Sequence, residues 1–269
     1  MIPQSLKSHA IPYVDLSTQD SDLQVFLNNL MAGYMSSKWT RKSRLLRHVF
    51  SRKVLIKFVR GNLLAAYLSD HYKCKCIFIL RHPCGVAASV LRKRKDRSHS
   101  RGIERGLGSA DLIRSLLDQA ALNQAYLSPF LPKIGKWTKD PFYRIVLAWA
   151  ITNFIPLKQI KDGMFNPELI LYERFVLKGA SSTSLSQFLD IDHMETGDGS
   201  YLQKDSISVR PERKGIPPAQ RVFSWKKELT EEQIREVYEI CSVFGSVLMD
   251  KIKEIDAIGE IADGLVIPQ

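Results

Sequence analysis

The sequence predicts an α/β protein in which helices cover a parallel β-sheet. Three runs of apolar and β-branched residues are expected to form buried strands: Val54–Val59, Cys76–Leu80 and Glu168–Tyr172. Short connections join the first two runs to helical segments. The order strand, helix, strand, helix with short connections is typical of a parallel sheet with right-handed crossovers.

The helices are indicated by apolar residues at the helical period and by capping residues. Asp20 or Ser21 can cap the first helix, and Gly61-Asn62 forms a turn before the third. Thr230 and Gln233 have capping-box spacing before the last one. The expected helices cover residues 21–34, 42–49, 63–68, 83–95, 111–126, 142–155, 184–189 and 231–248.

The composition is that of a globular chain able to bury one core. With 269 residues, 45% hydrophobic and 25% charged, we expect a single domain spanning residues 1–269. Met1-Ile2-Pro3-Gln4-Ser5 does not resemble a basic start before an apolar core, and no apolar run approaches a membrane span. We therefore expect neither secretion nor a membrane span, and a cytoplasmic location.

The four cysteines lie at positions 74, 76, 84 and 241. Cys74 and Cys76 are two apart, so they share one face of a strand, and no second pair completes a zinc site. We expect reduced, partly buried thiols and no metal.

The formal net charge is +11 and is concentrated in two runs. Residues 38–60 contain nine Lys or Arg and no acid, and residues 92–105 contain seven against Asp96 and Glu104. Such a field raises the local concentration of an anionic ligand. A single basic run of this kind is more often a solvated surface without a particular function. The position of the two runs on both sides of the Cys76–Leu80 strand favours a role in binding an anion.

The stretch from Cys76 to Lys95 predicts an anion site. Arg81 ends the strand, Pro83 stands where helices begin, and Ser89 lies about a turn and a half into the helix. The first turn of that helix has unpaired backbone N–H groups. A guanidinium, a helix N-terminus and a hydroxyl can together bind the several acceptor oxygens of a phosphate.

These residues resemble the sulfotransferase family, which moves a sulfuryl group from 3′-phosphoadenosine 5′-phosphosulfate (PAPS) to a hydroxyl or amine. The likeness covers about residues 54–245 and rests on three motifs in order: Arg81-His82-Pro83 with Ser89, Tyr172-Glu173, and Trp225-Lys226-Lys227-Glu228-Leu229-Thr230. It implies a three-layer fold like that of P-loop nucleotide hydrolases, with PAPS as cofactor.

The resemblance also implies roles for individual residues. Arg81 and Ser89 would bind the 3′-phosphate of PAPS, and Tyr172 would lie near the adenine. Lys57 resembles a lysine near the transferred sulfuryl group and is the candidate catalytic residue.

A further partial match is Arg213-Lys214-Gly215, which some family members use to bind the 3′-phosphate. Nine residues separate Gly215 from Trp225, which is longer than the expected spacing. A solvated loop is the alternative interpretation of this segment.

The chain departs from the family pattern twice. Animal cytosolic members carry a histidine base where this chain has Val59, and His82 is a poor substitute because its neighbour Arg81 would face the far end of the cofactor. The family also begins with a strand and a glycine-containing loop that binds the phosphosulfate. No such segment precedes Val54, where residues 1–52 predict an atypical helical segment, so the chain is either a fragment or has lost transfer chemistry.

Three alternatives to an active sulfotransferase remain open. A relative without catalysis would bind only the nucleotide or a partner chain, and a P-loop kinase relative would share the fold. A nucleic-acid-binding protein would explain the charge, but no recognition motif accompanies it, so we expect no nucleic acid partner. For a sulfotransferase, the basic surface suggests a polyhydroxylated acceptor such as a glycan, while the acceptor itself and the oligomeric state cannot be predicted.

Overall fold

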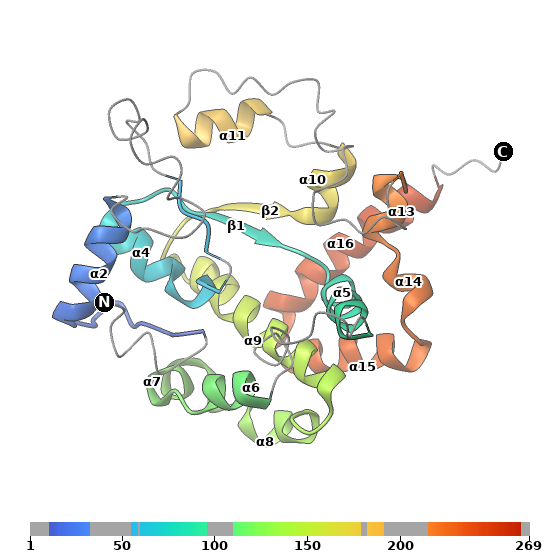
Figure 1. Cartoon of the computed structure of the whole chain (residues 1–269), viewed down its shortest axis with the longest axis horizontal. Coiled ribbons are helices and arrows are strands. Elements are labelled where there is room, and N and C mark those ends of the chain that lie inside the picture. Colours follow the sequence, from blue (N-terminus) through green and yellow to red (C-terminus); the bar gives the residue numbers. More distant parts are fainter. Residues whose placement is uncertain are drawn as a thin grey trace.

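The structure of the protein, a computed structural model, describes residues 11–32, 55–58, 60–95, 110–178, 182–190 and 215–264. Within them the chain is mostly helical with a small parallel sheet (Figure 1). The helices are α2 (Ser21–Met31), η2 (Asn62–Leu64), α4 (Ala65–Tyr72), α5 (Pro83–Lys95), α6 (Ala110–Leu117), α7 (Ala120–Leu122), η4 (Asn123–Leu127), α8 (Leu131–Ile134), η5 (Gly135–Trp137), α9 (Pro141–Lys161), α10 (Tyr172–Lys178), α11 (Ser182–Leu189), α13 (Pro218–Val222), α14 (Trp225–Glu228), α15 (Glu231–Ser242) and α16 (Ser246–Gly264).

The sheet consists of strands β1 (Ile77–Leu80) and β2 (Glu168–Leu171). They pair in parallel, with Ile77 opposite Glu168 and Leu80 opposite Leu171. The two strands therefore end side by side, and each is followed directly by the start of a helix, α5 after β1 and α10 after β2 (Figure 1).

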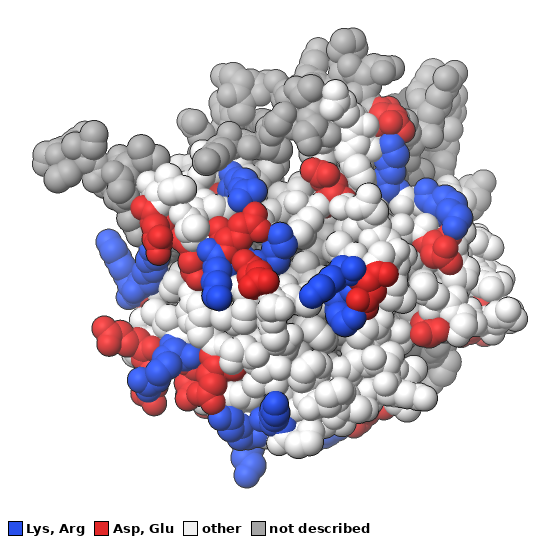
Figure 2. Space-filling model, turned by 180° about the vertical axis from the view of Figure 1, so that it is seen from behind, with Lys and Arg blue, Asp and Glu red and all other residues white. Residues whose placement is uncertain are grey.

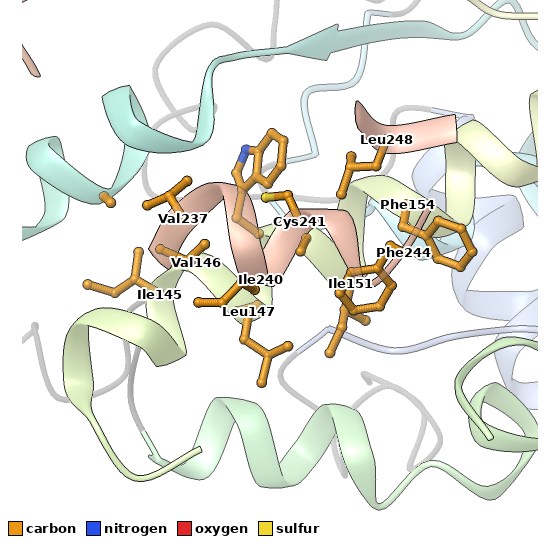
Figure 3. Packing of buried hydrophobic residues seen from close by; sticks show 14 of the residues in the cluster. Ile145, Val146, Leu147, Ile151, Phe154, Val237, Ile240, Cys241, Phe244 and Leu248 are labelled. Atoms are coloured by element: carbon orange, nitrogen blue, oxygen red, sulfur yellow. The ribbon is translucent and has the colours of Figure 1, made fainter. Parts of the chain in front are cut away.

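Helix α9 forms the centre of the main hydrophobic core. Asp140 caps it by accepting hydrogen bonds from the backbone N–H groups of Phe142 and Tyr143, and Pro141 occupies its first position. Its apolar residues lie against those of α15 and the first turn of α16 (Figure 3). The packed residues include Ile145, Val146, Leu147, Ile151 and Phe154 of α9, and Val237, Ile240, Cys241, Phe244 and Leu248 of α15, α16 and the turn between them. The expectation that this helix is apolar and buried nearly all round is confirmed.

Several local predictions are confirmed because short-range signals determine them. Asp20 caps α2, Pro83 begins α5, and Thr230 and Gln233 form the capping box of α15. The expected single helix over residues 231–248 is instead two helices. The chain breaks at Gly245, whose φ of 77° lies in the left-handed region that glycine adopts without steric cost.

The predicted strand Val54–Val59 is wrong for the residues that the structure describes. Residues 55–58 form no strand, and Leu55 is 86% exposed. A strand requires the edge of another strand, and apolar composition by itself does not supply one. The partner of β1 in this sheet is β2, more than 80 residues further along the chain.

The expected burial of β1 on both faces is also wrong. Phe78 and Leu80 are buried, but Ile79 between them is 59% exposed. The described helices therefore cover one face of this strand fully and leave the other accessible. A run of apolar residues predicts a strand but cannot determine how many layers pack on it.

Two other expectations are changed or lie outside the described residues. The expected helix over residues 111–126 is divided into α6, α7 and η4. The helix expected at residues 42–49 falls outside the described ranges. Among the described helices, none is both long enough and apolar enough to cross a membrane.

The packing in Figure 3 gives a stability prediction for α9. Replacement of the fully buried Ile151 by Ala should lower the free energy of unfolding by about 2–5 kcal/mol, because it leaves a cavity between α9 and α15. Urea denaturation followed by circular dichroism measures this difference. The matched control is Ile261→Ala in α16, where a side chain that is 55% exposed should change the value by less than about 0.5 kcal/mol. Equal losses in both variants would contradict the packing described.

Candidate functional site

Arg81 and Tyr172 meet where the two parallel strands end. Because Leu80 pairs with Leu171, the residues that follow them are neighbours. The guanidinium carbon of Arg81 lies 5.0 Å from the centroid of the Tyr172 ring, within the range of a cation–π contact. The carboxyl edge of parallel strands is also where ligands bind in open α/β sheets. Two residues predicted from the sequence are thus brought together.

Gly85 in the first turn of α5 gives the Arg81 side chain room to lie against the helix. A Cβ atom at this position would be 3.4 Å from Arg81 Nε and 3.5 Å from Cδ1 of Trp225, the carbon bonded to Nε1. Arg81 and Trp225 therefore converge over Gly85 from two different elements. An alanine here would make ordinary van der Waals contacts with both side chains, and a longer side chain would have to displace one of them.

Two buried N–H donors at this point have no acceptor. Arg81 Nε and Trp225 Nε1 are both buried and without a hydrogen-bond partner. No described residue forms an ion pair with Arg81. A buried donor that lacks a partner costs about 1–3 kcal/mol, so an acceptor-rich ligand that reached both atoms would recover that energy.

Ser89 lies on the same side of α5 as Gly85, because the two are four residues apart. It is half-buried. Further along this side, a hollow of about 260 Å³ lies between α5 and α14, lined by Ala88, Leu91, Arg92, Glu228 and Leu229. It is smaller than the roughly 300–1,000 Å³ of most small-molecule sites, and Arg92 is paired with Glu228 inside it.

Glu173, which follows Tyr172, stabilises the turn after β1 by a hydrogen bond. The side chain is fully buried, and its Oε1 accepts a hydrogen bond of 2.9 Å from the backbone N–H of His82, while Oε2 has no partner. Burial, the largest effect, raises the pKa of Glu173 above its ordinary value, although the N–H of His82 opposes this. A more readily protonated Glu173 presents less negative charge to an anion at Arg81.

His82 is enclosed by three C-terminal helices. Its ring stacks on Trp225 of α14 with centroids 4.6 Å apart and an interplanar angle of 2°, and Nε2 lies 3.1 Å from Oδ1 of Asp256 in α16. Nδ1 accepts from the backbone N–H of Cys84 at 3.2 Å, which places the hydrogen of the neutral ring on Nε2. Because the side chain is fully buried, it cannot act as a base toward an acceptor in this arrangement.

Asp256, which lies beside His82, also contacts α15. Its Oδ2 accepts a hydrogen bond of 2.7 Å from the hydroxyl of Tyr238. Burial alone would raise the pKa of Asp256, but the contacts with His82 and Tyr238 and the charge of Lys226 outweigh it, so the pKa lies below its ordinary value. Glu173, Asp256 and Tyr238 were not predicted as site residues from the sequence. The Tyr172-Glu173 motif includes Glu173, but the resemblance assigns a role only to the tyrosine.

The remaining predicted residues are not brought to this point by the described structure. Lys57 is exposed in a segment without regular structure, so its expected position in a buried strand is wrong. Arg213 and Lys214 lie outside the described residues. Gly215 is described, exposed and in the left-handed conformation at φ 77°, three residues before α13, which packs against α10.

The cysteines and other metal-binding residues indicate no metal centre in the part that the structure describes. All four cysteines are free; Cys84 and Cys241 are buried, and burial raises the pKa of both thiols. No group of three or more His, Cys, Asp or Glu residues is arranged to hold a metal ion among the described residues.

Charge is mixed on the face shown in Figure 2. Lys and Arg side chains lie beside Asp and Glu over the described part of this face, without a continuous basic patch. Most of the two basic runs, at residues 38–60 and 92–105, lies outside the described ranges. The described part of this face therefore lacks the basic stripe expected of a nucleic-acid-binding surface.

Comparison of the chain with protein-family models, with curated proteins and with solved structures finds no match.

The opposite pKa shifts of two buried carboxyls predict opposite pH dependences. Glu173→Gln keeps an oxygen acceptor for the His82 N–H but cannot ionise. Because the pKa of Glu173 is raised in the folded state, the stability of the wild type relative to this variant should be greatest below the ordinary value of 4.5 and should fall as the pH rises through the folded-state pKa. Urea midpoints measured between pH 4 and pH 8 give this dependence.

Asp256→Asn is the matched comparison, since its carboxyl has a lowered pKa. The stability of the wild type relative to Asp256→Asn should be present above the ordinary value of 3.8 and should be lost as the pH falls. The same pH dependence in both variants would contradict the environments described for these two carboxyls.

Proposed function

We propose that this chain is a sulfotransferase-type protein that binds PAPS through its 3′-phosphate at Arg81, Trp225 and the first turn of α5. The observation that carries the proposal is the pair of buried N–H donors without acceptors, Arg81 Nε and Trp225 Nε1, which converge over Gly85. A phosphate has enough acceptor oxygens to satisfy both donors, whereas the N–H groups of Cys84 and Val86 in the first turn of α5 already donate to His82. The proposed fold is the three-layer sheet typical of P-loop proteins, of which β1 and β2 are two strands.

The surrounding residues support an anion rather than a neutral ligand. Arg81 carries a permanent positive charge in a partly buried setting, where a charge-assisted hydrogen bond is stronger than in water. Tyr172 orients the guanidinium through the cation–π contact and presents a half-buried ring on which an adenine could pack. Ser89 adds a hydroxyl one turn beyond Gly85.

In the proposed reaction, the sulfuryl group passes from PAPS to an acceptor hydroxyl, and a polyhydroxylated acceptor such as a glycan fits the net charge of +11. Sulfuryl transfer has a loose transition state, so it needs fixed cations near the equatorial oxygens and the leaving phosphate. The residues at Arg81 would hold the distant 3′-phosphate and so position the donor.

Binding without transfer is the second candidate, and one observation favours it. Lys57, the candidate catalytic residue, is exposed, and His82 is fully enclosed. In this proposal the described residues would bind the 3′-phosphate of the nucleotide but would provide no base or cation for the sulfuryl group. Isothermal titration with adenosine 3′,5′-bisphosphate tests binding. Release of this product from PAPS in the presence of hydroxyl-bearing acceptors tests transfer separately.

Arg81→Ala should weaken the binding of adenosine 3′,5′-bisphosphate by roughly two orders of magnitude, because the variant loses a charge-assisted fork to the phosphate. Calorimetry measures the dissociation constant, and circular dichroism checks that the variant is folded. The control is Arg174→Ala in the first turn of α10, which removes the same charge from an exposed pair with Glu254. Equal affinity in wild type and Arg81→Ala, or an equal loss in Arg174→Ala, would refute the site.

Trp225→Phe should weaken binding roughly tenfold, since it removes one N–H donor and keeps an aromatic ring against His82. The same titration gives the value. If the variant bound the nucleotide as tightly as the wild type, Trp225 Nε1 would not be a ligand donor.

A further inference from the structure

Cys74 and Cys76 form a close pair of thiols away from the proposed phosphate site. They lie in the segment between the end of α4 and the start of β1, with their sulfur atoms 3.8 Å apart. Both side chains are half-buried, whereas Cys84 and Cys241 are buried. Cys74 and Cys76 are thus the two more accessible of the four cysteines.

The backbone around the pair allows the sulfurs to approach further. Disulfide formation would shorten the separation of the sulfur atoms from 3.8 Å to about 2.05 Å, which requires a small movement of the segment between α4 and β1. The carbonyl of Cys76 accepts a hydrogen bond from the backbone N–H of Glu168, which anchors that residue to β2. Cys74 precedes the ladder, so the adjustment is expected to fall on this residue.

The two thiols differ in acidity, which gives them different chemical roles. The hydrogen bond from Cys76, the largest effect, lowers the pKa of Cys74 from its ordinary 9.0 to about 7, although partial burial opposes this. The same bond raises the pKa of Cys76, which keeps its proton. At neutral pH, Cys74 is therefore about half thiolate, which is the form that attacks an oxidant. Cys76 remains a thiol and can react with Cys74 in a second step.

We propose that Cys74 and Cys76 are a modification site at which a hydroperoxide forms a reversible disulfide. The Cys74 thiolate attacks the peroxide oxygen, the O–O bond breaks, and the departing alkoxide or hydroxide takes up a proton, leaving Cys74 as a sulfenic acid. Cys76 then loses its proton and attacks the Cys74 sulfur, the S–O bond breaks, and water leaves. Two thiols and one hydroperoxide thus give one disulfide, one alcohol or water, and one further water.

A disulfide between Cys74 and Cys76 would change the contacts between α4 and the segment before β1. Cys74 Sγ donates a hydrogen bond of 3.4 Å to the carbonyl of Leu68, and Cys76 Sγ lies 3.9 Å from the carbonyl of Ala65, both in α4. A disulfide has no S–H to donate, so oxidation removes both contacts. This inference is independent of the proposed function, because it concerns the opposite end of β1 from Arg81.

The test treats the native full-length chain with one equivalent of hydrogen peroxide at pH 7. Free thiols are then blocked with N-ethylmaleimide in denaturant and the chain is digested with trypsin. Because Lys75 lies between the two cysteines, cleavage after Lys73, Lys75 and Arg81 leaves the peptides Cys74-Lys75 and Cys76–Arg81 held together only by the disulfide. The expected result is this linked pair, which dithiothreitol separates, with Cys84 and Cys241 still blocked by the maleimide.

Two variants assign the order of the steps. In Cys76→Ser, a dimedone adduct should accumulate on Cys74, because its sulfenic acid has no thiol to attack it. Cys76→Ala should slow alkylation of Cys74 by iodoacetamide at pH 7 by roughly five- to tenfold, since the thiolate fraction falls more than its nucleophilicity rises. Both cysteines fully blocked by maleimide in the peroxide-treated wild type, a link to Cys84 or Cys241, or oxidation of Cys74 to a sulfinic acid without a link would overturn the proposal.

Discussion

The turn after β1 places a histidine entirely inside the protein, and the surrounding elements are arranged to accommodate it. Its backbone N–H donates to Glu173 at the start of α10, its ring stacks on Trp225 of α14, and its Nε2 contacts Asp256 of α16. An unpaired buried polar group costs about 1–3 kcal/mol, so few arrangements of these helices are equally stable. The position of Arg81, one residue earlier, follows from this constraint.

The contrast between satisfied and unsatisfied groups in this small region is the strongest functional signal in the described structure. The backbone N–H and Nδ1 of His82 have hydrogen-bond partners, and its Nε2 lies 3.1 Å from Asp256 Oδ1 without a hydrogen bond, whereas Arg81 Nε and Trp225 Nε1 have no acceptor at all. Proteins pair nearly all buried polar groups, so two unpaired donors over one glycine support the proposed anion at this point. The raised pKa of Glu173 is compatible with an anion there.

Long-range and short-range electrostatics have separate roles in this molecule. The net charge of +11 attracts anions in general and depends on ionic strength. On the face in Figure 2, the described charges alternate in sign, so local selection of a ligand depends on a few oriented donors such as Arg81 and not on a broad patch. The proposed oxidation of Cys74 and Cys76, near the other end of β1, does not depend on this charge.

The sequence by itself determined the features that arise from neighbouring residues. The caps at Asp20 and Thr230, the helix start at Pro83, the buried helix around Trp149, and the strand that ends at Arg81 all depend on interactions within a few residues. The mixed helical and parallel-strand character followed from the same patterns. Arg81 and Tyr172 were each expected as site residues through the resemblance, but their contact with each other was not predicted.

Only the tertiary structure decided which strands pair and which buried groups meet. Residues 55–58 have the composition of a strand but form none, while β1 pairs with β2 far along the chain. Asp256 and Tyr238 give no local signal, because their importance comes from contacts with a histidine more than 150 residues away. Pairing and burial depend on what packs opposite a residue, and a pattern of neighbours in sequence does not contain that information.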